Sequence, residues 1–161
     1  MDLSICAACE AARGRARNDG GLNIEGTVLL DGRPWVGLRG PVVDGKALLL
    51  RLATTGAKAE QMLAIDLGGF AIRELSPWRG GVLVIAGPVS DDPVPHRLYW
   101  LRTPEATPVL LPVDLPPSTE GISVDDDGMA LIVTDGSGKA GSTCEVPSTW
   151  KRIHLPEPPT P

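Results

Sequence analysis

The sequence predicts an all-β fold of the β-propeller type, built from nearly three four-stranded antiparallel blades. A short β-rich pattern occurs three times, and each copy carries a glycine-containing turn between two apolar runs. The interval between the copies is close to the length of a propeller blade, which is about 40 to 50 residues. The 19 glycines and 16 prolines among 161 residues also indicate many turns, which favours short strands over long helices.

An N-terminal arm precedes the repeats. Residues 3–17 are rich in alanine and arginine, which favours helix, but they lack a continuous apolar stripe. Residues 1–20 are therefore expected to be an arm that is partly helical or disordered, with a boundary at the turn-forming run Asn18-Asp19-Gly20-Gly21. The arm lacks the basic start and apolar stretch of a secretory signal, which predicts a cytoplasmic chain.

Each repeat begins with a predicted hairpin. The two apolar runs are joined by Asp-Gly at 31–32, by Gly-Gly at 80–81 and by Asp-Gly at 127–128. These residues accept the positive φ that a tight hairpin turn requires, so we expect positive φ at Gly32, Gly81 and Gly128. Alignment on the glutamates at 25, 74 and 120 sets the repeat spacing at 49 and then 46 residues.

The remaining strands follow each hairpin. Third strands are expected at 46–52, 97–101 and 150–155, and fourth strands at 62–67 and 108–115, so that the blades cover about 21–67, 68–115 and 116–155. A turn of helix at 57–63 is the alternative to a fourth strand in the first unit. The third unit lacks a fourth strand, because residues 156–161 contain four prolines and are expected to form a loose tail.

Four strings in the first two units resemble a known family. They are Asn23-Ile24-Glu25-Gly26, Gly37-Leu38-Arg39-Gly40-Pro41, Ile72-Arg73-Glu74-Leu75 and Ala86-Gly87-Pro88. In this order they resemble an uncharacterised bacterial family, domain of unknown function 3616. The resemblance covers Gly21 to about Asp135, and implies that the chain corresponds to the C-terminal part of a longer member. It implies no activity.

The aligned glutamates define the candidate site. If the repeats are blades, Glu25, Glu74 and Glu120 converge on one mouth of the central channel, where their charges repel unless a cation or an arginine compensates them. With Asp135 they are the candidate metal ligands, and Ca²⁺ or Mg²⁺ is the cation that suits their oxygens. The candidate ligand- or anion-binding residues are Asn23, Arg39 and Arg73. In the other interpretation, arginines pair with the glutamates and hold the ring together.

Two classes of function follow from this cluster. The first is a binding or scaffold module with an axial Glu/Arg cluster, which needs no cofactor. The second is a metal-dependent hydrolase of esters or phosphoesters, because a Glu-Gly at the start of the innermost strand looks like calcium-dependent phytase-like and lactonase-like propellers. That likeness is at the level of the fold and carries no function by itself.

Charge and blade number predict the partners. A net charge of −5 disfavours nucleic acid, and no apolar run approaches the roughly 20 residues needed to cross a bilayer. The three cysteines, Cys6, Cys9 and Cys144, show no disulfide-framework spacing. Because propellers close with about four to eight blades, nearly three blades predict either a homodimer that approaches six blades or upstream blades of a longer chain.

Overall fold

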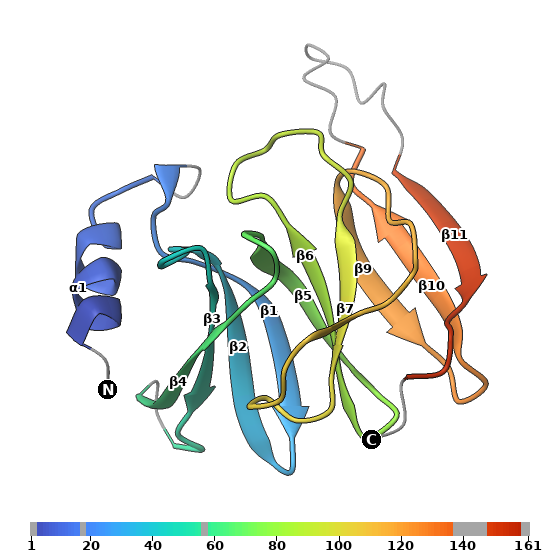
Figure 1. Cartoon of the computed structure of the whole chain (residues 1–161), viewed down its shortest axis with the longest axis horizontal. Helices are drawn as coiled ribbons and strands as arrows, with labels where there is room; N and C mark the ends of the chain where they lie inside the picture. Colours follow the sequence, from blue (N-terminus) through green and yellow to red (C-terminus); the bar gives the residue numbers. More distant parts are fainter. Residues whose placement is uncertain (1–2, 17–18, 56–57, 137–147, 159–161) are drawn as a thin grey trace.

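Three antiparallel sheets lie side by side and make up most of the chain (Figure 1). The computed structural model describes residues 3–16, 19–55, 58–136 and 148–158. The first sheet has the order β1 (Asn23–Leu30), β2 (Arg33–Gly40), β3 (Ala47–Leu52) and β4 (Ala59–Ile65). The second has the order β5 (Ala71–Trp78), β6 (Gly81–Gly87), β7 (Arg97–Leu101) and β8 (Val109–Leu110). The third has the order β11 (Thr149–His154), β10 (Met129–Thr134) and β9 (Thr119–Val124).

The prediction of an all-β, propeller-type fold is confirmed by these sheets of four, four and three strands. The helical alternative at 57–63 is wrong where the structure describes it, because β4 occupies Ala59–Ile65; Ala57 lies outside the described residues. The expected strand at 108–115 is reduced to the two residues of β8, and Leu115 makes an isolated bridge with His96. The third sheet ends at β11 without a fourth strand among the described residues.

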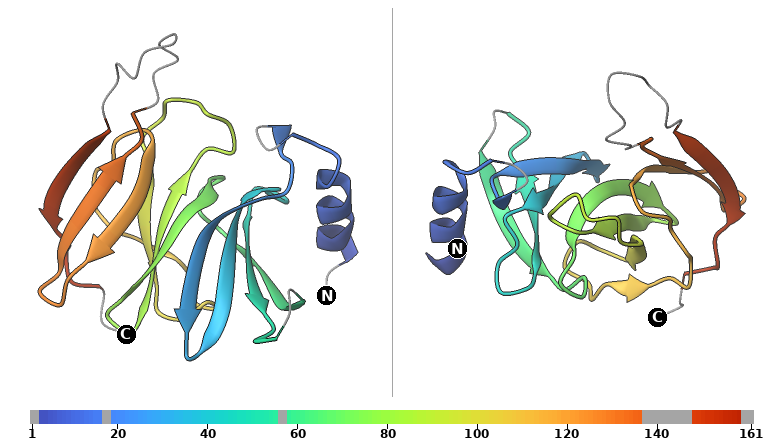
Figure 2. Two further views of the ribbon diagram at one scale, coloured as in Figure 1. Left: turned by 180° about the vertical axis from the view of Figure 1, so that it is seen from behind. Right: turned by 90° about the horizontal axis from the view of Figure 1, so that it is seen from above.

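The core consists of two apolar layers between the three sheets. One layer, between the first and second sheets, includes Trp35, Leu49, Leu75 and Val84. The other, between the second and third sheets, includes Leu83, Leu98, Ile122, Ile132 and Leu155. Burial of these side chains holds the sheets face to face, as in the successive blades of a propeller, and Figure 2 shows the same stacking from behind and from above.

The helix α1 (Leu3–Ala12) lies against the outer face of the first sheet (Figure 1). Cys9 packs against a small apolar cluster on that face, formed by Leu38, Leu48 and their neighbours. The backbone N–H of Leu22 donates to the carbonyl of Ala12 at 3.3 Å. The helix therefore caps the first sheet.

Two further sequence predictions concern Cys144 and the membrane. Cys144 lies outside the described residues. No helix of the described chain has both the length and the apolar character to cross a membrane.

The hairpin turns follow the expectation in two units and depart from it in one. Gly32 has φ 70° and Gly128 has φ 83°, as expected. In the second unit, Arg79 (φ 49°) and Gly80 (φ 71°) form the turn, so the prediction for Gly81 is wrong by one residue. Gly81 is already in β6, where a Cβ atom would clash with the backbone carbonyl of Leu101 and meet the indole Nε1 of Trp100 at 2.8 Å. Its glycine is needed for close packing and not for the turn.

Candidate functional site

The first strands of the three sheets lie next to one another, since β5 contacts β1 on one side and β9 on the other. Each of these strands has a β-bulge near its start, which leaves one extra residue unpaired with the neighbouring strand. The extra residue is Glu25 in β1, Arg73 in β5 and Glu120 in β9. A bulge bends the strand and redirects the side chain, and here it brings the three charged groups together.

The register of the bulges corrects the repeat alignment. The repeat pattern aligns Glu25 with Glu74, but the structural equivalent of Glu25 is Arg73, the residue before Glu74. The same slip of one residue separates the expected turn at 80–81 from the observed turn at 79–80. The two adjacent glycines fit the pattern in either register, and a shift of one residue turns every side chain to the other face. The charges at the axis therefore alternate as glutamate, arginine and glutamate.

Arg73 joins all three sheets. Its Nη2 donates to Oε1 of Glu120 at 2.7 Å, and its Nε lies 3.0 Å from Oε2 of Glu25. The second contact is an ion pair whose N–H does not point at the oxygen, so both atoms are buried without a well-aligned hydrogen bond. Nη1 donates to the carbonyl of Pro88 at 3.3 Å. Since the Arg73 side chain is only 7% exposed, its charge depends on these partners.

Arg39 comes from β2 and holds the loop between β6 and β7. Its Nη1 donates to Oε1 of Glu25 at 3.0 Å, and its Nε and Nη2 each donate at 2.8 Å to the carbonyls of Val89 and Ser90. Nη2 also contacts the carboxylate of Asp91. Burial alone would lower the pKa of Arg39, but the hydrogen bonds to Asp91 and Glu25 raise it overall.

The remaining candidate residues divide into two groups. Asn23 joins the cluster, because its Nδ2 donates to Oε1 of Glu25 at 3.1 Å. Glu74 lies beside it and is half-buried; burial and the charge of Glu120 raise its pKa, and a hydrogen bond from the backbone of Leu75 opposes this. Asp135 is exposed, and its backbone N–H donates to the carbonyl of Ser118 at 2.8 Å. We refer below to the axial cluster, which consists of Asn23, Glu25, Arg39, Arg73 and Glu120.

His96 borders the axial cluster and was missed by the sequence analysis. It is 4% exposed, and neither ring nitrogen has a well-aligned hydrogen bond, although the backbone of Val94 approaches the ring. Burial and the charge of Arg73 lower its pKa from 6.5 to about 4, so the imidazole is neutral at pH 7. The ring lies against Gly87, where any Cβ atom would contact Nε2. The glycine of the Ala-Gly-Pro string was the available signal, because it marks such a close approach.

The donor set of the axial cluster does not fit a divalent cation. Calcium takes six to eight oxygen ligands, whereas the carboxylates of Glu25 and Glu120 are already in contact with arginine side chains. Within residues 3–16, 19–55, 58–136 and 148–158, no three His, Cys, Asp or Glu side chains are grouped so that they could hold a metal ion. A metal at these residues stays a prediction from the sequence.

Two open cavities are lined by residues outside the axial cluster. One, of about 290 Å³, is lined by residues of β4 and the β7–β8 loop, among them Leu63 and Pro104. The other, of about 280 Å³, lies at the hairpin turns and is lined by Trp35, Arg51 and Arg102 among others. No residue of the axial cluster lines either cavity. The cluster and the cavities are therefore separate features.

Fold and site together define a propeller-type repeat module with a buried ion-pair cluster at the point where its sheets meet. The chain belongs to the family described as protein of unknown function (DUF3616), whose model matches residues 16–108. The match covers the first sheet and the second sheet up to the residue before β8, including Asn23, Glu25, Arg39 and Arg73. No curated protein sequence matches the chain. The family description adds no activity to the geometry.

Proposed function

We propose that the protein is a binding or scaffold module, and that the axial cluster holds its sheets in a fixed arrangement. The observation that supports this is the position of Arg73, whose guanidinium contacts carboxylates from the sheets on both sides, at 3.0 Å to Glu25 and 2.7 Å to Glu120. An arginine fork can satisfy several acceptors at once, which suits a linking role. Three sheets joined in this way form a rigid support for loops and edges that bind.

The electrostatics of the cluster support a structural role over a catalytic one. Removing one partner of a buried ion pair leaves an uncompensated charge, which typically costs about 3 to 5 kcal/mol. A catalytic carboxylate would instead be expected to face a ligand or a water-filled pocket. The cavities of about 280 and 290 Å³ have no lining residue from the cluster.

The metal-dependent hydrolase is the alternative, and one experiment addresses both. Thermal melting is followed with and without Ca²⁺ and Mg²⁺ for the wild type and for Arg73→Met, which removes the positive charge between the two glutamates. A ligand that binds the native state raises its stability, by about 2.7 kcal/mol at one hundred times its Kd. We expect no shift for the wild type. A metal-dependent rise in its Tm would overturn the scaffold proposal in favour of the alternative.

A metal response confined to Arg73→Met would agree with the scaffold proposal, because it would mean that the arginine occupies the place of a cation. Arg102→Met is the matched control, since Arg102 is an exposed arginine that belongs to no ion pair among the described residues. That variant is expected to behave as the wild type at every metal concentration.

A further inference from the structure

The turn glycines allow residues of the three sheets to be compared position by position. The third residue after the turn glycine is Trp35 in the first sheet, Leu83 in the second and Leu131 in the third. Trp35 and Leu83 both belong to apolar layers that face the next sheet along the chain. We call the face that carries these residues the forward face of each sheet. Leu131 lies at the same position on the third sheet.

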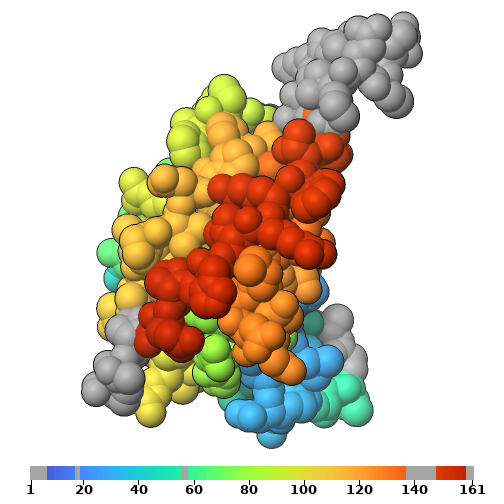
Figure 3. Space-filling model, turned by 90° about the vertical axis from the view of Figure 1, so that its right-hand side faces the viewer, coloured from blue at the N-terminus to red at the C-terminus, as the bar shows by residue number. Residues whose placement is uncertain are grey.

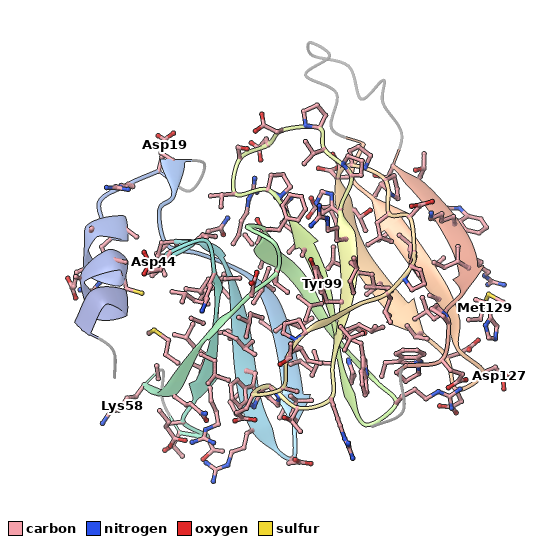
Figure 4. All side chains as sticks on the ribbon, in the orientation of Figure 1. Asp19, Asp44, Lys58, Tyr99, Asp127 and Met129 are labelled. Atoms are coloured by element: carbon pink, nitrogen blue, oxygen red, sulfur yellow. The ribbon has the colours of Figure 1, made fainter. Side chains whose placement is uncertain are left out.

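The forward face of the third sheet is uncovered. Trp35 and Leu83 are 4% and 0% exposed, but Leu131 is 38% exposed. The third strands show the same contrast, because Leu49 and Leu98 are 2% and 0% exposed whereas Trp150, at the equivalent register, is 68% exposed. Met129 lies on this face as well, at the right-hand side of Figure 4. Apolar positions that are buried in two sheets are thus open in the third.

The edge of the third sheet is open as well. In the first two sheets a fourth strand pairs with the third strand, whereas β11 is paired only with β10 among the described residues. The chain after β11 turns away, since the backbone N–H of Leu155 donates to the carbonyl of Gly128 at 2.9 Å and Glu157 forms an ion pair with Arg79 at 3.1 Å. Figure 3 shows β10 and β11 on the surface, in orange and red.

The first sheet shows what a fourth strand contributes at this edge. There, Arg51 of β3 lies 3.6 Å from the carboxylate of Glu60 on β4, which also contacts Arg33 at 3.3 Å. Three residues further along β4, Leu63 lies opposite Leu49 and packs on the forward layer. The fourth strand therefore brings one acidic and one aliphatic side chain, at a spacing of three residues.

The third sheet carries the two matching positions without these partners. Arg152 of β11 lies opposite Leu131, as Arg51 lies opposite Trp35, so the two arginines are equivalent. Arg152 is exposed and forms no ion pair with any residue that the structure describes. Trp150 is at the position of Leu49. An added strand of the β4 type would place its glutamate near Arg152 and its leucine beside Trp150.

We propose that the edge of β11 binds an extended acidic segment of another protein as the missing fourth strand. The backbone of β11 supplies hydrogen bonds along the edge, Arg152 selects an acidic residue, and Trp150 selects an aliphatic residue three positions later. The strand Thr149–His154 contains Lys151, Arg152 and His154 and no acidic residue, so the edge disfavours a second β11 of the same charge. This inference rests on the proposed binding function and names the class of partner.

The test uses a synthetic peptide with the sequence of residues 58–66, KAEQMLAID, which contains the fourth strand of the first sheet. Binding is measured by anisotropy of the labelled peptide and by the change in tryptophan fluorescence. Trp35, Trp78 and Trp100 are buried, so the fluorescence change should come from Trp150 and should vanish in Trp150→Phe. Arg152→Glu should weaken binding about three- to tenfold, and a peptide with Glu60→Arg should recover affinity for that variant.

Two controls keep the proposal falsifiable. Arg102→Glu makes the same change of charge at another exposed arginine and should leave the affinity unchanged. If the peptide binds equally well to wild type and Arg152→Glu, it occupies another place, such as that of β4 itself, and the proposal is wrong. Absence of binding up to millimolar peptide, or a concentration-dependent dimer in light scattering that Arg152→Glu dissociates, would also overturn it. None of these outcomes affects the metal-melting test of the axial cluster.

Discussion

Replacement of His96 by glutamine should change how stability depends on pH. A histidine that is buried in its neutral form binds a proton more weakly in the folded chain than in the unfolded chain, because burial and the nearby charge of Arg73 both disfavour the protonated imidazole. The unfolded chain therefore takes up more protons as the pH falls. The stability that His96 contributes is present above its unfolded pKa and is lost as the pH falls toward its folded pKa.

The size of the effect follows from the two pKa values. With 6.5 in the unfolded chain and about 4 in the folded chain, the free energy of unfolding should fall by about 2 kcal/mol between pH 7 and pH 5 because of His96 alone. Glu74 acts in the opposite direction, since its raised pKa means that the folded chain holds a proton more tightly as the pH falls. The comparison is therefore made in a Glu74→Gln background as well.

Urea unfolding at pH 7, 6 and 5, followed by tryptophan fluorescence, measures the difference. His96→Gln should lose less stability than the wild type over this range, by the amount that His96 contributes. His154→Gln removes the exposed histidine and is the control for the substitution itself. Parallel pH profiles for wild type and His96→Gln would mean that the imidazole is not held neutral beside the cluster, and would refute the reasoning.

Three glycine substitutions extend the test to the fold. Gly32→Val should destabilise the protein by about 1 kcal/mol or more, because φ is 70° at this turn residue, and urea unfolding measures it. Gly81→Ala should destabilise the protein more than an alanine at a solvent-exposed strand position, since its Cβ would clash with the carbonyl of Leu101 and lie 2.8 Å from the indole nitrogen of Trp100; a loss below about 0.5 kcal/mol would contradict the observed register. Gly87→Ala should destabilise by about 1 to 3 kcal/mol through contact with His96, and His96→Ala should relieve part of this loss; equal losses in the two backgrounds would contradict it.

The strands could be predicted because their signals are local. Asp31-Gly32 and Asp127-Gly128 each contain a glycine that adopts positive φ, and the alternation of apolar residues around them defines the hairpins. The second hairpin was placed one residue late because Gly80 and Gly81 both permit the turn. The packing of Gly81 against the carbonyl of Leu101 and the indole of Trp100 distinguishes them, and these contacts are made by β7, about twenty residues away in the sequence.

The sequence predicts which residue types form the candidate site better than it predicts how they are arranged. Glu25, Glu120, Asn23, Arg39 and Arg73 lie together, but the position that the repeat alignment gave to Glu74 is taken by Arg73. The bulges that bring Arg73 between the glutamates depend on strand pairing, which composition does not reveal. The position equivalent to His96 in the first sheet is occupied by Ala47, so the repeat gives no signal for a histidine, and its burial beside Arg73 follows only from the tertiary fold.

A double-mutant cycle between Arg73 and Glu120 tests most directly whether the axial cluster joins the sheets. Unfolding free energies are measured for Arg73→Met, Glu120→Gln and the double variant, with Arg79→Gln and Glu157→Gln as a control cycle on an exposed ion pair of 3.1 Å. Because Arg73 is 7% and Glu120 40% exposed, we predict a coupling of about 1 kcal/mol for the axial pair and near zero for the control. Additive losses for Arg73 and Glu120, within about 0.3 kcal/mol, would contradict the account.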